Sequence, residues 1–322
     1  MKPSVFYAKI MLFGEYGVIW NSMALTIPYA HFSGALAFIN DEQYTRYEFA
    51  VESNRHLRDY LGYLKELRND PAFGFEFNLE GLEKDIDSGL YFESNIPQGY
   101  GIGSSGALVA AIYDEYQAAN RSKGRKIFTE TEIAVFRENF AKMESYFHGT
   151  SSGLDPLLCY IRHPLLIRSR KQIETVSIPR GKFGSNSAIF LVDTGVLGKT
   201  GPLVNLFREK CREEKYLERV EKVMIPANDG CIVSLLEGTM DDFFVHLSGL
   251  SAFQYESLNE MIPAHMMPYW DAGLQRDDFK LKLCGSGGGG FLLGISRDFS
   301  STRDYFRQQG LELIPVYKND LL

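Results

Sequence analysis

The sequence lacks the features of disulfide-rich, zinc-binding, membrane-spanning and nucleic-acid-binding proteins. Its 322 residues include four cysteines, which are scattered and form neither a C-x-x-C pair nor a group with histidines at metal-binding spacing. They predict reduced thiols in a cytoplasmic protein rather than a disulfide framework or a zinc site. No apolar run approaches the roughly 20 residues that a helix needs to cross a bilayer. The formal net charge of −7 disfavours nucleic acid or an acidic membrane surface as a partner.

Internal repeats, low-complexity tracts and long linkers are also absent from the sequence. The hydrophobic content of 45% and the charged content of 23% are ordinary for a globular protein. The length favours two domains. The polar, glycine-bearing stretch 180–187 predicts a boundary between them, which gives domains of residues 1–184 and 185–322. Helical and strand patterns mix throughout, as is typical of an α+β or α/β fold.

Glycine is abundant, and its first cluster lies just before residue 104. Residues 97–107 read P-Q-G-Y-G-I-G-S-S-G-A and run into an apolar, alanine-rich stretch that predicts a helix. Gly101, Gly103 and Gly106 allow a close approach of the backbone to a ligand. The unpaired N–H groups and the dipole at a helix start attract phosphate, and Ser104 and Ser105 add hydroxyls. The segment therefore predicts a phosphate site.

Two better-known phosphate motifs do not fit this chain. The spacing of the three glycines satisfies G-x-G-x-x-G, but that motif follows a strand directly, and Asn95, Pro97 and Gln98 precede the loop here. Residues 198–200 read G-K-T like the end of a P-loop, but Asp193 stands where its first glycine is required. The remaining alternative is a glycine-rich helix start that binds nothing.

A second glycine cluster lies near the end of the chain. Residues 279–283 alternate apolar and charged side chains, which predicts a half-buried strand. Five glycines then fall within residues 285–290, and residues 291–295 form a second apolar run. A hairpin needs only about two turn residues. So many glycines favour a loop that wraps a ligand over a loose surface loop.

Two further segments carry candidate charged residues. Lys9 lies in an apolar strand, and two interpretations are open: its amine reaches the surface, or it is a cation needed for function. A turn that contains Glu15 and Tyr16 follows the strand.

Residues 129–132 form a capping box for a helix that Gly149 ends. Glu144 lies in its last turn, where a carboxylate opposes the helix dipole unless a cation binds. Residues 150–156 predict a small polar loop. Without a functional role, Asp155 would be a turn or cap residue in this loop.

These segments, taken in chain order, resemble the three motifs of the GHMP kinases. Residues 97–107 are similar to the phosphate loop P-x-x-x-G-L-G-S-S-A-A, with Ile102 in place of Leu and Gly106 in place of the first Ala. Residues 282–290 resemble the third motif, so the resemblance spans almost the whole chain. It implies an α+β fold with an S5-like N-terminal domain, a ferredoxin-like C-terminal domain, and ATP and substrate in the cleft between them.

Within the family, the mevalonate kinases are most similar. Residues 9–18 resemble K-x-I-L-x-G-E-H-x-V, residues 148–155 resemble H-G-x-P-S-G-x-D, and residues 193–200 resemble D-T-G…T. Tyr16 replaces the usual histidine and Ser151 the usual proline. Gly-Glu-Tyr and Gly-Ser-Ser-Gly are also reminiscent of the phosphomevalonate kinases, which are the alternative. A ligand-binding GHMP-fold protein without activity is a second alternative, against which the presence of Lys9, Ser105, Glu144 and Asp155 argues.

The resemblance implies a role for each of these residues in the transfer of the γ-phosphoryl group of ATP to the primary hydroxyl of mevalonate. Asp155 would be the catalytic base with Lys9 as its cationic neighbour, and Ser105 and Glu144 would bind Mg²⁺. Glu15, Tyr16 and Thr200 would line the substrate site. The residues expected to bind ATP are Pro97, Gly99, Gly101, Gly103, Ser104, Ser105, Gly106, Gly285, Gly287 and Gly288. A small-molecule alcohol is the expected partner, and a homodimer would fit the family.

Overall fold

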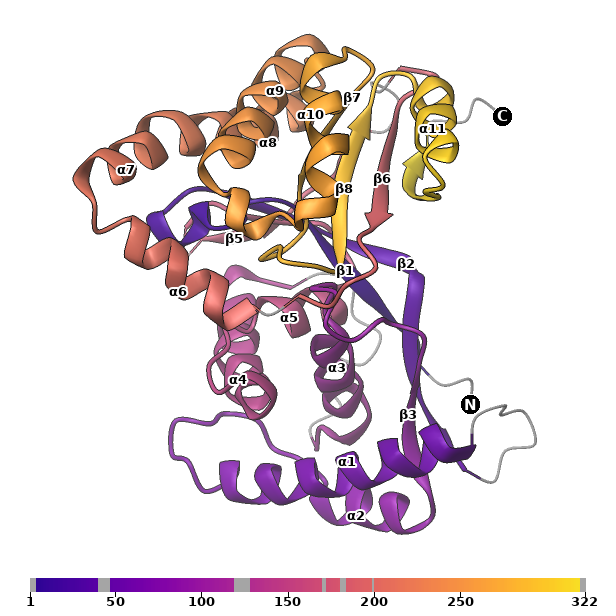
Figure 1. Ribbon diagram of the computed structural model, residues 1–322. Coiled ribbons are helices and arrows are strands. Elements are labelled where there is room, and N and C mark those ends of the chain that lie inside the picture. Colours follow the sequence, from indigo (N-terminus) through magenta and orange to yellow (C-terminus); the bar gives the residue numbers. More distant parts are fainter. Residues whose placement is uncertain are drawn as a thin grey trace. The chain divides into compact units, whose positions relative to one another are not determined.

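The chain forms helices and sheets that separate into two compact units (Figure 1). The computed structural model describes residues 4–39, 47–118, 128–169, 172–179, 184–198 and 200–318. The first unit comprises Met1–Lys9, Pro28–Pro97 and Gly103–His163, and the second comprises Ile10–Ile27, Gln98–Ile102 and Pro164–Leu322. The chain therefore passes between the units several times. The domain boundary predicted after residue 184 stays a prediction.

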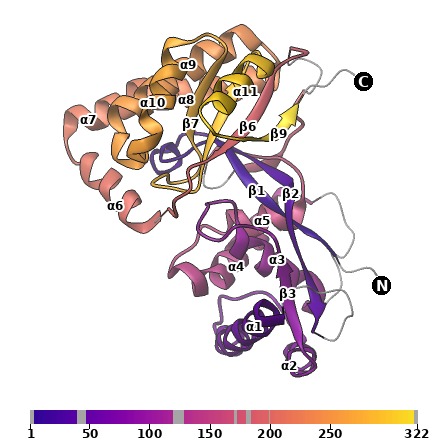
Figure 2. The same ribbon diagram turned by 45° about the vertical axis from the view of Figure 1, so that its right-hand side comes forward.

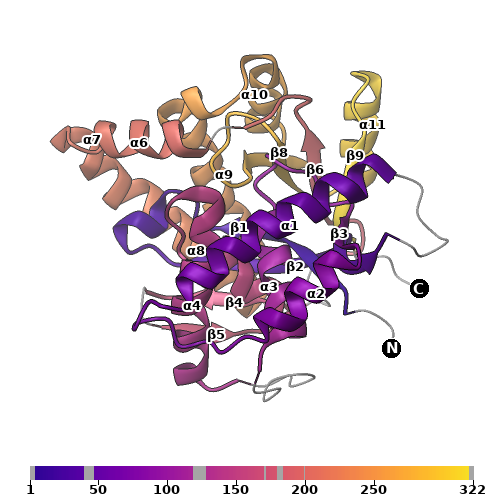
Figure 3. The ribbon, with the colours of Figure 1, turned by 90° about the horizontal axis from the view of Figure 1, so that it is seen from below.

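The first unit is mainly helical. Its helices are α1 (Tyr47–Leu67), α2 (Leu79–Asp87), α3 (Ser104–Tyr116), α4 (Glu130–His148) and α5 (Leu154–Ile161). Strand β3 (Leu90–Ser94) pairs antiparallel with residues 34–38 of β2 (Ala24–Phe38). Helix α1 packs against α2 and β3 (Figure 3). Helices α3, α4 and α5 pack on one another around an aromatic core made by Phe75, Tyr113, Phe136, Phe140 and Tyr160.

Helix α4 begins and ends as the sequence predicts. The Thr129 side chain accepts a hydrogen bond from the Glu132 backbone N–H, and the Glu132 carboxylate accepts one from the Thr129 N–H. These two bonds confirm the capping box. Gly149 ends the helix with φ 72°, a conformation that glycine adopts without strain.

Helix α5 begins earlier than the sequence predicts. The polar loop predicted for residues 150–156 is wrong from Leu154 onward, because α5 starts there and Asp155 lies in its first turn. Gly153 precedes the helix with φ 73°, and a Cβ there would lie 2.0 Å from the Arg137 carbonyl oxygen of α4. The close approach of α4 thus requires glycine at 153. A carboxylate in the first turn is favoured by the helix dipole.

The second unit contains a four-stranded sheet in the order β7-β8-β6-β9. Its strands are β6 (Ala188–Asp193), β7 (Phe279–Leu283), β8 (Phe291–Ser296) and β9 (Leu313–Lys318). All three pairings are antiparallel, which agrees with the predicted α+β class. Strand β1 (Phe6–Phe13) and β2 belong to another sheet, in which residues 24–26 pair with β4 (Leu165–Ile167) and β4 pairs with β5 (Ile173–Thr175).

Six α-helices accompany these strands in the part of the second unit that the structure describes. They are α6 (Thr200–Lys210), α7 (Glu214–Arg219), α8 (Ile225–Glu237), α9 (Met240–Ser257), α10 (Met267–Gln275) and α11 (Phe299–Gln308). Helices α9 and α10 pack on β7 (Figure 2). The charged stretch 203–223 is divided among α6, α7 and a π-helix (Val220–Met224). No helix among the described residues is long and apolar enough to cross a membrane.

Strand β7 is buried on both faces, so the prediction of a half-buried strand is wrong. Its two lysines are buried because each amine finds oxygen partners. Lys280 Nζ donates to the carbonyls of Gly273 and Arg276 at the end of α10. A lysine at this position stabilises the helix terminus. Lys282 pairs with Glu15 of the second unit. The alternating lysines of β7 are therefore two buried amines and do not form a solvent-exposed face of the strand.

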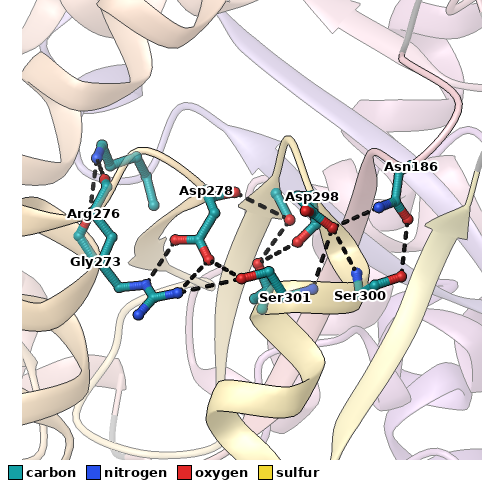
Figure 4. Close-up of polar contacts among 10 residues, drawn as sticks. Asn186, Gly273, Arg276, Asp278, Asp298, Ser300 and Ser301 are labelled. Carbon is teal, nitrogen blue, oxygen red and sulfur yellow. Dashed lines mark hydrogen bonds and ion pairs between the residues drawn. The ribbon is translucent and has the colours of Figure 1, made fainter.

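A polar network joins the start of α11 to the turn before β7 (Figure 4). The Arg276 guanidinium donates two hydrogen bonds to Asp278, at 2.8 and 2.6 Å, and the Ser301 hydroxyl donates to the same carboxylate. Asp298 caps α11 by accepting from the Ser300 and Ser301 N–H groups. The network anchors α11 through a helix cap and a bidentate ion pair.

Candidate active site

Four predicted site residues come together in the first unit from four different elements. Lys9 lies on β1, Ser105 in the first turn of α3, Glu144 in the last turn of α4, and Asp155 in the first turn of α5. The packing of α3, α4 and α5 on one another therefore brings residues 105, 144 and 155 together. The predicted grouping of these side chains is present in the structure.

Lys9 and Asp155 form an ion pair. Lys9 Nζ lies 3.1 Å from Asp155 Oδ1, and the side chains are 7% and 32% exposed. The lysine amine thus does not reach for the surface, the alternative that the sequence left open. A Cβ at Gly103 would lie 2.7 Å from Lys9 Cγ, so glycine at 103 leaves space for this side chain. Asp155 keeps enough exposure to meet a bound molecule.

Gly106 lets α3 approach Asp155 closely. A Cβ at this position would lie 2.7 Å from the Asp155 carbonyl carbon and 2.8 Å from the Pro156 nitrogen. Backbone atoms cannot move aside as a flexible side chain does, so a larger residue would displace the first turn of α5. The sequence predicted Gly106 as an ATP contact, and the structure adds a packing role.

Glu144 is buried and accepts two hydroxyl hydrogen bonds. Ser105 Oγ donates to Oε1 at 2.9 Å, and Ser151 Oγ donates to Oε2 at 2.5 Å. Ser105 Oγ also lies 3.0 Å from His148 Nε2. Neither Ser151 nor His148 was predicted to be a site residue. Spacing could have found His148, because residues 144 and 148 are neighbours on one helix face.

The environment of Glu144 favours a bound cation. Burial raises the pKa of Glu144 to about 7, and the negative charge of Asp155 adds to this effect. Hydrogen bonds from Ser151 and Ser105 and the charge of Lys9 act in the opposite direction. The carboxylate therefore lacks sufficient compensation from the protein alone. A cation beside it would favour the charged form.

The donor set fits Mg²⁺ rather than a transition metal. Among the described residues, no group of three or more His, Cys, Asp or Glu side chains is arranged to bind a metal. A carboxylate and a hydroxyl are hard oxygen donors, and Mg²⁺ commonly takes one or two carboxylates with phosphate oxygens and retained waters. Ser105 and Glu144 supply these donors, and Ser105 Oγ lies 2.9 Å from Glu144 Oε1, close enough for both oxygens to face one ion.

The second unit brings residues 98–102 of the first glycine cluster against the second glycine cluster. A Cβ at Gly101 would lie 3.7 Å from the Cys284 carbonyl oxygen, and one at Gly290 would lie 2.9 Å from Tyr100 Cα. The stretch 194–198 lies against the same segments, because Gly290 N–H donates to the Val196 carbonyl and Gly198 N–H to the Gly99 carbonyl. Residues predicted as ATP contacts, Gly99, Gly101, Gly285, Gly287 and Gly288, thus belong to one loop cluster.

The three residues predicted to line the substrate site also belong to the second unit. Glu15 pairs with Lys282, and the Tyr16 hydroxyl donates to the Ser286 carbonyl. Thr200 begins α6, but its side chain lies outside the described part of the structure, as does all of residue 199. Their contact with substrate stays a prediction.

Comparison with known proteins supports the resemblance. Residues 60–162 match the model of the GHMP kinases N terminal domain. The mevalonate kinase of Pyrococcus horikoshii is 27% identical over 231 residues, which are 67% of this chain and 63% of that protein's length. Two solved structures share the fold: L. major mevalonate kinase with R-mevalonate, and Streptococcus pneumoniae phosphomevalonate kinase with phosphomevalonate and AMPPNP.

Both structural matches extend over nearly the full chain. The L. major protein has a TM-score of 0.65 at 15% identity and covers 100% of this chain and 97% of its own. The S. pneumoniae protein has a TM-score of 0.62 at 13% identity, with coverages of 97% and 98%. The chain shares the fold of these two kinases, and residues 60–162 match the N-terminal domain model of the GHMP kinases. Within that class, the curated relatives that the chain matches are mevalonate kinases.

Proposed function

We propose that this chain is a kinase that uses ATP and Mg²⁺ to phosphorylate the primary hydroxyl of mevalonate. The observation that carries the proposal is the Lys9–Asp155 ion pair within one unit that also contains the Ser105–Glu144 contact. Asp155, with Lys9 as its paired cation, would supply the base. Ser105 and Glu144 would supply the metal site. The named relatives support the choice of substrate.

The chemistry follows from the positions of the side chains. Asp155 would accept the proton of the substrate hydroxyl as its oxygen attacks the γ-phosphorus. Lys9 would stabilise negative charge on the transferred group, since phosphoryl transfer depends on positioning and charge stabilisation. Ser105 and Glu144 would hold Mg²⁺, which neutralises charge on the phosphate oxygens when it is bound. The first turn of α3 supplies N–H groups and a positive dipole end for phosphate.

The phosphomevalonate kinases remain the second candidate. Tyr16 and Gly106 are the residues that favour them, and the S. pneumoniae phosphomevalonate kinase shares the fold. A protein that only binds ligands would not require a base paired with a cation, so the Lys9–Asp155 pair argues against that alternative. A cytoplasmic location and a homodimer remain predictions.

ATP turnover by the purified protein tests the proposal against mevalonate, phosphomevalonate, galactose and homoserine. We expect turnover with mevalonate and a loss of about 10²–10⁴-fold in Asp155→Asn, which retains the shape but not the base. Asp70→Asn is the matched control, because Asp70 forms an Asp–Lys pair with Lys142 at 2.6 Å in the same unit, outside the site. Turnover with phosphomevalonate alone would favour the second candidate, and none with any alcohol would contradict both.

A further inference from the structure

The buried ion pair between Lys282 and Glu15 lies at the start of the second glycine-rich loop. Lys282 Nζ donates to Glu15 Oε1 at 2.6 Å and to the Leu283 carbonyl at 2.5 Å. The side chains are 0% and 2% exposed. Burying two charges costs more than their attraction returns unless the geometry is good. Such a pair is therefore an expensive way to stabilise a fold.

Each member of the pair depends on the other. Among the described residues, none donates a hydrogen bond to Glu15 Oε2. Lys282 is thus the principal compensation for the Glu15 charge. In turn, Lys282 places a donor on the carbonyl of Leu283, the last residue of β7 before the loop. Gln254 of α9 accepts from the Leu283 N–H, so both backbone groups of that residue are fixed.

Tyr16, the next residue after Glu15, contacts the middle of the same loop. Its hydroxyl donates to the Ser286 carbonyl at 2.5 Å, and its ring packs against Phe207 of α6 at 4.8 Å. Burial raises the pKa of Tyr16 well above its ordinary value, so the hydroxyl stays a donor. Tyr16 has φ 61°, a strained conformation for a residue with a side chain. Such strain is commonly found where function requires a fixed geometry.

The loop between these contacts is fixed along its length. Gly288 N–H donates to the Met261 carbonyl at 2.5 Å, and Gly290 N–H donates to the Val196 carbonyl at 2.7 Å. A Cβ at Gly287 would lie 2.4 Å from the Met261 carbonyl oxygen, so only glycine fits there. Glu15 and Tyr16 therefore add fixed points at the first half of a loop whose second half is already bound to the backbone.

We propose that Glu15, Tyr16 and Lys282 are positioning residues for the glycine-rich loop 284–290. Glu15 acts through Lys282 on the Leu283 carbonyl, and Tyr16 acts on the Ser286 carbonyl. The loop is then held in one arrangement for binding the phosphates of the nucleotide. This role differs from the substrate contact predicted for Glu15 and Tyr16, and it rests on the proposed function in that the loop binds ATP.

Tyr16→Phe separates the two roles, because it removes the hydroxyl and keeps the ring on Phe207. We expect the KM for ATP and the Kd for AMPPNP to rise about tenfold, as for loss of one useful hydrogen bond. The KM for the alcohol should change by less than about twofold, within the scatter expected of a neutral substitution. Tyr216→Phe is the matched control, since its hydroxyl donates to the Ser257 carbonyl at 2.9 Å in the same aromatic cluster. A rise in the alcohol KM alone would overturn the proposal.

The ion pair is tested by removing one charge and then both. Glu15→Gln leaves Lys282 unpaired, so we expect a lower Tm and a raised KM for ATP. Glu15→Gln with Lys282→Met removes both charges and should recover most of the Tm. Its KM for ATP should stay raised, because Lys282→Met removes the donor of the Leu283 carbonyl. A double variant that recovers both quantities would overturn the proposal. Lys280→Met, a change of the other buried lysine of β7, should lower Tm without changing the KM for ATP.

Hydrogen exchange without any ligand keeps this inference separate from the proposed function. We expect faster exchange of the amides of residues 285–290 in Tyr16→Phe and in the double variant, but not in Tyr216→Phe. Unchanged exchange would overturn the positioning role whatever the protein binds. Failure of the unsubstituted protein to bind AMPPNP would instead overturn the proposed function.

Discussion

At the residue scale, Lys9 is the side chain whose loss should separate catalysis from binding. It lies 3.1 Å from Asp155, and its side chain is only 7% exposed. We expect Lys9→Met to lower kcat by about 100-fold or more, the effect of removing one preorganised electrostatic group. The Kd for ATP should change far less. Lys142→Met removes the lysine of the Lys142–Asp70 pair and serves as the control. An ATP affinity that falls as steeply as kcat would contradict this role.

Glu144 gives the stability of the chain a pH dependence with a defined sign. Its folded pKa of about 7 exceeds the ordinary value of 4.5, so the folded chain binds the proton more tightly than the unfolded chain. Between these two pH values the unfolding free energy therefore falls as pH rises. Over this range, the ionisation of Glu144 lowers the unfolding free energy by about 3 kcal/mol.

Urea unfolding in the presence of EDTA at pH 5 and pH 8 measures this contribution. Glu144→Gln cannot titrate, so its stability relative to the unsubstituted protein should improve between the two pH values. Saturating Mg²⁺ should diminish the difference, because a cation favours the ionised carboxylate. Parallel pH dependences for the two proteins would show that Glu144 does not titrate in this range.

At the scale of elements, the contact between α3 and α5 positions the base. A Cβ at Gly106 would meet the backbone of Asp155 and Pro156 at under 3 Å. We expect Gly106→Ala to destabilise the chain by about 1–3 kcal/mol through overpacking and to lower kcat. Gly62→Ala in α1 is the matched control, since no atom lies within 4 Å of its Cβ position. That change should instead stabilise the chain by roughly 0.5–1 kcal/mol. An unchanged kcat in Gly106→Ala would show that α5 adapts without moving Asp155.

The elements also show which patterns a sequence reveals. The capping box at Thr129 and the stop at Gly149 were predictable, because both depend on residues within four positions of the helix end. The start of α5 was not, since it depends on the close approach of Arg137 from another helix. The burial of β7 was hidden because Lys280 and Lys282 resemble solvent-facing residues until their distant partners are known.

At the scale of the whole molecule, the order of the motifs in the sequence predicted the fold, and the structure adds the path of the chain between the two units. The chain leaves the first unit at Lys9, returns at Pro28, leaves again after Pro97 and returns at Gly103. A polar segment can mark a linker between contiguous domains, but it gives no sign of a strand or loop that passes through two units. The pairing of Lys9 with Asp155 and of Ser105 with Glu144 was predictable from the resemblance to the family motifs. The hydrogen bond from Ser151 to Glu144 required the structure, because Ser151 lies beyond the end of α4.

Ligand binding should stabilise the molecule in a metal-dependent way. A ligand at 100 times its Kd raises the unfolding free energy by about 2.7 kcal/mol. We expect ATP to raise Tm more with Mg²⁺ than with EDTA, and Glu144→Gln to lose most of that difference. Calorimetry or dye-based thermal unfolding gives the comparison. An equal metal effect in the variant would remove Glu144 from the metal site.

Transfer of label from γ-³²P-ATP to mevalonate tests the central claim most directly. The account predicts a labelled phosphomonoester at the primary hydroxyl that requires Mg²⁺, is lost in Asp155→Asn and is retained in Asp70→Asn. Label that appears only in inorganic phosphate, or product formation that survives in Asp155→Asn, would contradict the assignment of Asp155 as the base of a mevalonate-phosphorylating kinase.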